Sequence, residues 1–303
     1  MISNMDDAPP RAAIIGVTGF IGSGLPALLA EKGMASTGVS RSGGGSMQEV
    51  VRWQTPDRLD FAGHHAVINL AGAPISRRWT RDNKLVFHES RVGVTRRVVD
   101  AIRLLPADAR PKVLINGSAV GIYGDRGDEV LTESSAPGTG YLAELCRDWE
   151  QAAVEAEALG VRVIRLRTGV VLGQGGEAFE KLVRVFISGI GGRLGNGRQW
   201  MPWIHVEDLR AAIVHAVFSE SLSGPVNGSA PAAERNANFT RKLASALHRP
   251  ALLPVPGFAL KLALGGFGGA LLASQHARPA ALEADGFKFR FPTLESALAD
   301  LVR

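Results

Sequence analysis

The stretch that decides the fold is Ala12-Ala13-Ile14-Ile15-Gly16-Val17-Thr18-Gly19-Phe20-Ile21-Gly22. An apolar run of strand length leads into glycines at positions 16, 19 and 22, and an apolar helical pattern follows. The first glycine permits a sharp turn, the second lets the backbone approach a pyrophosphate, and the third lets the helix pack closely on the strand. We therefore expect a dinucleotide site formed by Gly16, Thr18, Gly19, Phe20, Ile21 and Gly22. The alternative is a glycine turn with a purely structural role.

Short apolar runs and helical patterns alternate through much of the chain. The runs expected to form buried strands are residues 36–40, 65–70, 112–116, 161–166 and 224–227, and the expected helices are 81–104, 141–160 and 204–217. Such alternation is typical of a parallel sheet that carries helices on both faces. We therefore predict an α/β protein with a doubly wound parallel sheet, the Rossmann fold, whose ligand cleft lies at the carboxyl ends of the strands.

Glycine-rich loops change the character of the sequence after residue 170. The loops at 173–176 and 189–197 flank an amphipathic helix, and such loops often shape a substrate cleft or lid, although they can be plain connections. We expect a dinucleotide-binding domain over residues 11–170, to which residues 204–228 return. Residues 171–203 and 229–303 are expected to form a smaller, mostly helical C-terminal substrate domain.

The composition is that of an ordinary globular protein, with 303 residues of which 46% are hydrophobic and 21% charged. Cys146 is the single cysteine, so no intrachain disulfide is possible and a reducing, cytoplasmic compartment fits. The net charge is +5, but the arginines are scattered, and nucleic-acid binding is not expected. Residues 1–10 are expected to be a loose tail rather than a signal peptide. Lys261 and five glycines interrupt the apolar segment 257–274, which predicts a packed helix pair and not a membrane span.

The end of the second expected strand carries Ser40-Arg41-Ser42. Proteins that bind NAD in this way hold the adenosine ribose with an acidic residue about 20 positions past the glycines. A guanidinium beside two hydroxyls instead suits a 2′-phosphate, through charge-assisted hydrogen bonds. Ser40 and Arg41 therefore predict NADP(H) as the cofactor rather than NAD(H). The alternative is an exposed loop arginine that binds nothing.

Four further stretches, together with the glycine motif, carry a family resemblance. They are residues 68–75, 142–150, 167–173 and 195–209. The chain resembles the extended short-chain dehydrogenases/reductases of the NAD-dependent epimerase/dehydratase superfamily. Within that superfamily it is similar to the atypical "epimerase family protein" branch, which is sometimes labelled cell-division-inhibitor-like. The resemblance spans residues 11–303 and implies a dinucleotide cofactor.

The resemblance also implies further contacts to the cofactor. Leu70, Ala71 and Gly72 pass the cofactor after the strand at 65–70, and Arg167 and Thr168 lie beside it after the strand at 161–166. Arg91 stands where extended members often carry Asn, and the resemblance implies that it faces the cofactor. Physically, an arginine there can hold a phosphate or a ribose; the alternative is a solvated helix arginine.

The catalytic Tyr-x-x-x-Lys pair that is usual in this superfamily is missing. Tyr141 is followed four places later by Leu145, and alignment on Glu150 puts Leu142 and Cys146 in the pair's positions. The lysine of such a pair lowers the pKa of the tyrosine, which exchanges a proton with the substrate. Standard oxidoreductase chemistry therefore cannot be assumed for this chain.

Ser118 and Tyr123 are the candidate catalytic residues that the sequence offers. They lie in residues 117–124, which resemble the Ser-Ser-x-x-Val-Tyr-Gly stretch of the extended group. Either they contact substrate and transfer a proton, or they have a purely structural role. His205 lacks a visible partner and is expected to anchor the two domains rather than to carry a proton. The spacing of histidines and the single cysteine predict no metal site.

Two functions follow as hypotheses. The first is an NADP(H)-dependent oxidoreductase or epimerase-like enzyme that acts on a small carbonyl or sugar-like substrate. The alternative is a non-catalytic NADP(H)-binding redox sensor or regulatory partner protein, in cell division as the family label suggests. The expected helices 81–104 and 141–160 offer a homodimer interface, or they simply pack in the core.

Overall fold

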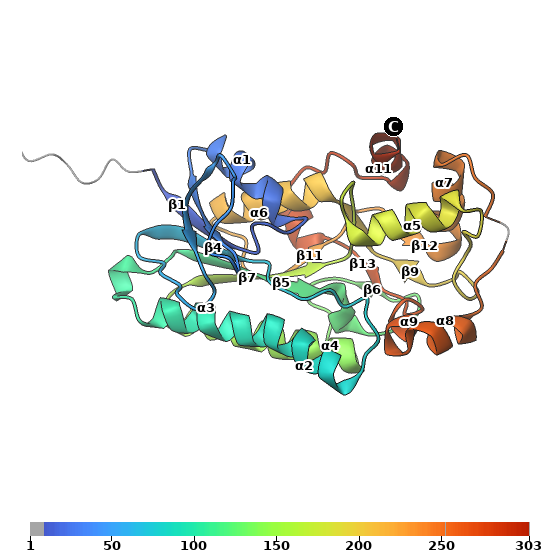
Figure 1. Cartoon of the computed structure of the whole chain (residues 1–303), viewed down its shortest axis with the longest axis horizontal. Coiled ribbons are helices and arrows are strands. Elements are labelled where there is room, and N and C mark those ends of the chain that lie inside the picture. The colour runs from blue at the N-terminus through green and yellow to red at the C-terminus, as the bar shows by residue number, and fades with distance from the viewer. Residues whose placement is uncertain (1–8, 252, 303) are drawn as a thin grey trace, which may run out of the picture.

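A computed structural model describes residues 9–251 and 253–302, so most of the expected N-terminal tail lies outside the described residues. The centre of the protein is a seven-stranded parallel sheet with the strand order β11-β7-β5-β4-β1-β2-β3 (Figure 1). Its strands are β1 (Arg11–Ile15), β2 (Ala35–Val39), β3 (Val50–Gln54), β4 (His64–Asn69), β5 (Val113–Ala119), β7 (Arg162–Thr168) and β11 (Gly224–Gly228). The predicted doubly wound sheet is confirmed.

Alternate side chains of the central strand β1 serve the two faces of this sheet, as the pleat requires. Ala12 and Ile14 pack in one hydrophobic cluster, and Ala13 and Ile15 pack in another. Because both faces are covered, the strand reads as one continuous apolar run. The strand order reverses between β1 and β4, which both pair with parallel neighbours. A reversal of this kind opens a crevice at the carboxyl ends of the strands, where ligands bind.

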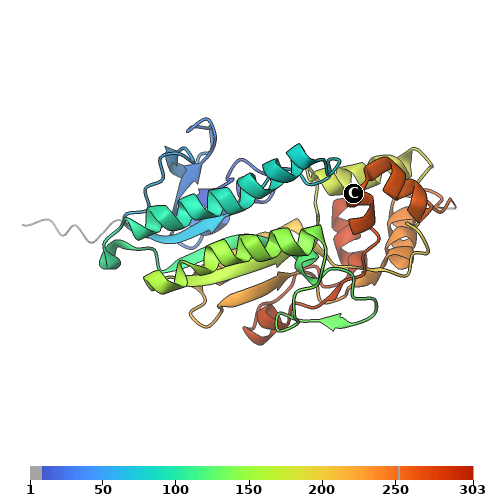
Figure 2. The same cartoon turned by 90° about the horizontal axis from the view of Figure 1, so that it is seen from below.

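Helices cover the two faces (Figures 1 and 2). On one side, α1 (Leu25–Ala30) and α6 (Val206–Phe218) contribute Leu25, Leu29 and Ile213 to the cluster that holds Ile14. On the other side, α3 (Val94–Arg103) and α4 (Tyr141–Val154) contribute to the cluster that holds Ile15. The helix expected over residues 81–104 runs as α2 (Arg81–His88), a π-helical segment (Glu89–Gly93) and α3.

The rest of the chain forms a helical region beside the carboxyl ends of the strands (Figure 1). Its helices are α5 (Glu177–Ile187), α7 (Asn236–Ala246), α8 (Gly257–Leu264), α9 (Gly266–Ala270) and α11 (Leu294–Leu301). The short helix α10 (Ala280–Ala284) instead packs against β11, and its Leu282 lies in the cluster that holds Ile14. Three short strand pairs join the helical region: β6 (Val130–Leu131) with β13 (His276–Ala277), β8 (Val170–Leu172) with β10 (Trp203–His205), and β9 (Trp200–Met201) with β12 (Glu234–Arg235).

The predicted helix pair at residues 257–274 is present as α8 and α9. A Cβ atom at Gly268 would lie 2.3 Å from the Leu260 carbonyl oxygen, so the two helices approach at a glycine. None of the helices in residues 9–251 and 253–302 has the length and hydropathy needed to cross a membrane. Within the same described ranges, no group of three or more His, Cys, Asp or Glu side chains is placed to hold a metal ion.

Candidate functional site

The glycine turn after β1 has the tight geometry that its sequence predicts. Gly16 has a φ of +86°, which favours glycine, and a Cβ atom there would lie 3.3 Å from the Leu70 carbonyl group. A Cβ atom at Gly22 would lie 2.3 Å from the Gly16 carbonyl oxygen, and the Gly19 amide donates to that same oxygen at 2.9 Å. The chain therefore folds back on itself at the carboxyl end of β1. Thr18 and Gly19 are exposed on this turn, and Phe20 and Ile21 are half-buried.

The end of β2 places Ser40 and Arg41 next to each other with different surroundings. Ser40 is buried, and its hydroxyl contacts the Ser42 hydroxyl at 3.2 Å and donates to the Gly44 carbonyl at 3.2 Å. The Ser42 hydroxyl donates to the same carbonyl at 3.0 Å, which closes a short loop around Arg41. Arg41 is exposed, and its guanidinium has no hydrogen bond or ion pair within the described part of the chain. Its five N–H donors are therefore open to a ligand.

The turn after β4 consists of Leu70, Ala71 and Gly72, and the side chain of Asn69 holds it by a hydrogen bond. The buried Asn69 side chain accepts a hydrogen bond from the Ala71 amide at 3.2 Å. Its Nδ2 atom donates to Asn116 Oδ1 at 2.7 Å and to Thr95 Oγ1 at 3.0 Å. Buried amide networks of this kind hold a turn in one conformation. Sequence reasoning missed Asn69 and Asn116, although two asparagines at the ends of adjacent apolar runs were a usable signal.

Arg91 lies on the π-helical segment and reaches over the same turn. One terminal nitrogen donates to the Ala73 carbonyl at 3.0 Å, and the guanidinium carbon lies 5.3 Å from the centre of the Trp149 ring. A Cβ atom at Gly72 would be 3.1 Å from that guanidinium carbon. Burial lowers the pKa of Arg91. Single π-helical turns frequently occur at functional sites, and this one brings a cation against the residues that the sequence assigned to the cofactor.

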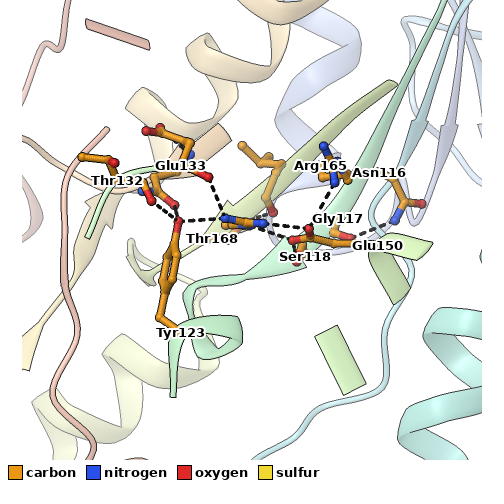
Figure 3. Close-up of polar contacts among 12 residues, drawn as sticks. Asn116, Gly117, Ser118, Tyr123, Thr132, Glu133, Glu150, Arg165 and Thr168 are labelled. Atoms are coloured by element: carbon orange, nitrogen blue, oxygen red, sulfur yellow. Dashed lines mark hydrogen bonds and ion pairs between the residues drawn. The ribbon is translucent and has the colours of Figure 1, made fainter. Parts of the chain in front are cut away.

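Ser118 and Arg167 are register partners on β5 and β7, and both contact Glu150 of α4. The Ser118 hydroxyl donates to Glu150 Oε1 at 2.7 Å. The guanidinium of Arg167 donates from Nε to Oε1 at 2.8 Å and from a terminal nitrogen to Oε2 at 2.9 Å. Burial disfavours the charge on Arg167, but these hydrogen bonds and the charge of Glu150 outweigh it and raise the pKa of Arg167. Figure 3 shows Ser118 beside Glu150, with Thr168 at the end of the neighbouring strand.

Tyr123 continues the same buried network. Its hydroxyl accepts a hydrogen bond from Arg167 at 3.0 Å and can donate to Asn227 Oδ1 at 2.8 Å or to the Thr132 carbonyl at 3.0 Å (Figure 3). Burial raises the pKa of Tyr123, against the lowering effect of the Arg167 charge. Neither Ser118 nor Tyr123 is more than 5% exposed. Both hydroxyls are therefore hydrogen-bonded to other groups of the chain. Their catalytic role stays a prediction. Sequence reasoning missed Asn227, which lies 104 residues from Tyr123.

The positions of the missing Tyr-x-x-x-Lys pair are apolar. A Cβ atom at Gly121 would lie 3.3 Å from Leu142, which packs against the turn after β5. Cys146 is buried, and burial raises the pKa of its thiol to about 12. Tyr141 packs edge-on against Trp79 with ring centres 5.0 Å apart, and the Lys84 ammonium lies 4.5 Å from its ring centre. None of these contacts reproduces a lysine that activates a tyrosine.

His205 joins α6 to the C-terminal helix. Its Nδ1 atom accepts a hydrogen bond from the Glu207 amide at 3.1 Å, and its Nε2 atom lies 3.4 Å from an Asp300 carboxylate oxygen. The ring also packs on Phe291, with centres 3.9 Å apart. Burial lowers the pKa of His205. These contacts are those of an anchor between segments.

A cavity of about 440 Å³ lies where the 195–199 loop meets residues 125–128. Asn196, Gln199 and Arg235 supply polar groups to it, and Leu272 supplies an apolar one. The loop is part of the glycine-rich segment that the sequence assigned to a substrate cleft.

Comparisons with known proteins agree with this architecture. The model of the NAD dependent epimerase/dehydratase family matches residues 12–227, and a domain of unknown function, DUF1731, matches residues 255–301. A chloroplastic homolog of epimerase family protein SDR39U1 from Arabidopsis thaliana is 38% identical, over 100% of this chain and 90% of that protein. An epimerase family protein of Mycobacterium leprae is 40% identical, over 95% of this chain and 94% of that protein.

A solved structure of the human epimerase family protein SDR39U1 (isoform 2), determined with NADPH, superposes on this chain with a TM-score of 0.87. The two chains are 31% identical, and the match covers 96% of this chain and 99% of the human one. Together with the match of the family model over residues 12–227, this identity shows that the chain belongs to the NAD dependent epimerase/dehydratase family.

Proposed function

We propose that the chain binds NADP(H) along the carboxyl ends of β1, β2, β4 and β5. The observation that carries this proposal is the open guanidinium of Arg41, which follows β2, the strand paired with β1, while the closed glycine turn of residues 16–22 follows β1 itself. In this arrangement, the amides of the glycine turn bind the pyrophosphate, and Ser40 and Arg41 bind the 2′-phosphate. The structure of human SDR39U1 was determined with NADPH, which supports NADP(H) as the cofactor of the present chain.

The other residues assigned to the cofactor complete the site. Leu70, Ala71 and Gly72 lie along the turn after β4, with Arg91 above them, and Thr168 ends β7 beside the buried Arg167. We place the nicotinamide half against this turn. Titration of the purified chain with NADPH and NADH tests the assignment of Ser40 and Arg41 to the 2′-phosphate, because only this phosphate distinguishes the two ligands.

For the reaction, we propose an NADP(H)-dependent oxidoreductase or epimerase-like activity on a small carbonyl or sugar-like substrate. Residues 171–203 and 229–303 supply the substrate side, which includes the cavity beside Asn196 and Arg235. Ser118 and Tyr123 are the proposed proton carriers. Loss of NADPH absorbance in the presence of a panel of aldehydes and ketones tests the oxidoreductase activity. An epimerase regenerates its cofactor, so the epimerase-like activity is tested by NMR detection of a second epimer in sugars incubated with the chain and cofactor. With a turned-over substrate in hand, a Ser118→Ala or Tyr123→Phe variant that folds and turns over at the wild-type rate contradicts the role of that residue.

A second candidate is a non-catalytic NADP(H)-binding sensor or regulatory protein. The observation that favours it is that Leu142 and buried Cys146 replace the catalytic pair, while the hydroxyls of Ser118 and Tyr123 bind protein partners. A sensor binds the cofactor without consuming it and distinguishes its redox states. Hydrogen exchange of the chain with NADPH and with NADP⁺ tests this function. Different protection patterns without turnover support the sensor, and identical patterns contradict it.

A further inference from the structure

Arg210 of α6 contacts the glycine turn although 190 residues separate it from Phe20. One terminal nitrogen donates to the Phe20 carbonyl at 2.6 Å, and Nε donates to the Ile21 carbonyl at 3.1 Å. The other terminal nitrogen donates to the Glu207 carboxylate at 2.7 Å. The arginine side chain is only 15% exposed. The guanidinium thus binds two consecutive main-chain carbonyls and is itself oriented by an acid one helical turn away.

The sequence around the turn leaves room for this contact. A Cβ atom at Gly24 would lie 2.5 Å from the guanidinium carbon of Arg210, so a larger residue there would displace it. The Phe20 ring in turn packs where Gly173 and Gly176 lack side chains, each would-be Cβ atom being 2.7 Å from a ring carbon. The turn is therefore held by the bonds from Arg210 to the carbonyls of Phe20 and Ile21, and by the packing of the Phe20 ring.

Peptide geometry links these carbonyls to the opposite side of the turn. A trans peptide is planar, and its C=O and N–H groups point in opposite directions. The described residues have no cis peptide bonds. When Arg210 holds the carbonyls of Phe20 and Ile21, the amides of Ile21 and Gly22 point away from α6. Because α6 packs beside α1 on one face of the sheet, these amides are turned away from that helix layer.

We propose that Arg210 is a positioning residue for the pyrophosphate of the bound dinucleotide. It does not touch the phosphates; it holds the Phe20–Ile21 and Ile21–Gly22 peptides so that their N–H groups are aimed at them before the ligand arrives. Preorganised donors bind an anion more tightly because no ordering cost remains at the moment of binding. This inference rests on the proposed function, since it requires a dinucleotide in the site.

Two ligands separate this role from a general structural one. NADPH contains both the pyrophosphate and the 2′-phosphate, whereas adenosine 2′-monophosphate contains only the latter. We expect Arg210→Met to raise the Kd for NADPH at least tenfold and to leave the Kd for adenosine 2′-monophosphate unchanged. Arg210→Lys keeps the charge and one donor, so its Kd for NADPH is expected to lie between those of the wild type and Arg210→Met. Arg96→Met, at an exposed position on α3, is the matched control and is expected to bind both ligands normally.

The binding experiments use titration calorimetry for NADPH and ligand-observed NMR for the weaker mononucleotide. An unchanged Kd for NADPH in both Arg210 variants would overturn the inference, and so would an equal loss of affinity for both ligands. If Arg210→Met does not fold, Arg210→Lys still tests the inference. A lysine variant that binds NADPH with wild-type affinity contradicts it. If the wild type itself binds no NADPH, the proposed function fails, which is a distinguishable result.

Discussion

Glu150 and Arg167 form a two-bond ion pair that is almost completely withdrawn from solvent, with side-chain exposures of 6% and 5%. The pair joins α4 to β7 and gathers Ser118 and Tyr123 around it. Arg165 lies 3.7 Å from the same carboxylate and is less buried. The residues that the sequence offered as catalytic therefore belong to a buried electrostatic cluster that links α4 to the sheet.

Removal of one partner of this pair is expected to destabilise the protein strongly. Glu150→Gln leaves a buried guanidinium without a counter-charge, which costs about 3–5 kcal/mol in comparable pairs. Glu155→Gln, at the end of the same helix, is the control, because its ion pair with Arg103 is half-exposed and exposed pairs contribute about 0–1 kcal/mol. Urea unfolding at neutral pH measures both. Equal losses in the two variants would contradict the account of the pair.

Tyr123→Phe tests the other end of the cluster. The variant removes the hydroxyl that links Arg167 to Asn227 and leaves those buried groups with one partner fewer. We expect a loss of about 1–3 kcal/mol in the free energy of unfolding, as for other buried polar groups left unsatisfied, and unchanged NADPH affinity. Urea unfolding and calorimetry check the two parts. A fully stable variant shows that the network contributes nothing, and a variant that loses NADPH shows that Tyr123 belongs to the cofactor site.

Gly22→Ala is expected to disrupt the glycine turn. Its Cβ atom would lie 2.3 Å from the Gly16 carbonyl oxygen, a main-chain atom that cannot move without unfolding the turn. We expect NADPH binding to be lost and the melting temperature to fall. Gly269→Ala is the control, because a Cβ atom there meets no atom within 4 Å and alanine favours a helix by up to about 1 kcal/mol over glycine. Normal NADPH binding by Gly22→Ala would show that close backbone packing at this turn is not required.

The contact between Asp285 and His215 predicts a dependence of stability on pH. Burial opposes the charge of Asp285, but hydrogen bonds from Ser221, Ser219 and His215 outweigh it and lower the pKa of Asp285 below its ordinary value; the His215 Nε2 atom lies 2.6 Å from the carboxylate. A carboxyl group whose pKa is lower in the folded state stabilises the protein above its unfolded pKa of about 3.9, and this stability is lost as the pH falls through the folded value.

Wild type is therefore expected to exceed Asp285→Asn in unfolding free energy at a pH of about 5.5, and the gap is expected to shrink as the pH falls below about 3.9. Urea unfolding at a series of pH values measures the gap. Asp57→Asn, at an exposed position without a side-chain hydrogen bond among the described residues, is expected to show no such change. A gap that widens in acid would contradict the direction of the pKa shift.

The fold was largely predictable because most strands of the central sheet are buried, and each of them is a short run of consecutive residues. The apolar runs of β1, β4 and β5 are continuous because both faces of a parallel sheet are covered, and each predicted strand overlaps the observed one. The sequence analysis did not place β3. Val51 and Arg52 of that edge strand are exposed, so the strand lacks the continuous apolar run that marks the buried strands, although its Val-Val-Arg-Trp-Gln sequence favours a strand. The predicted helix over 81–104 was right in extent, but its π-helical segment has no signal in the apolar spacing.

The site was predictable only where it is local. Gly16, Gly19 and Gly22 are neighbours in sequence, and the turn that they form requires no distant partner. Ser118 lies 32 residues from Glu150 and contacts it only through the packing of α4 on the sheet. Arg210 is still more distant from the turn that it binds. A motif reveals which residues are available, whereas their hydrogen-bond partners depend on the tertiary fold.

The measurement that tests the central claim most directly is calorimetric titration of wild type, Arg41→Ala and Arg96→Ala with NADPH and NADH. The account predicts tight binding of NADPH and much weaker binding of NADH by wild type and by Arg96→Ala. It predicts that Arg41→Ala loses the preference for NADPH, because the substitution removes the charge that faces the 2′-phosphate. Absence of binding by either nucleotide, or an unchanged preference in Arg41→Ala, would contradict the account.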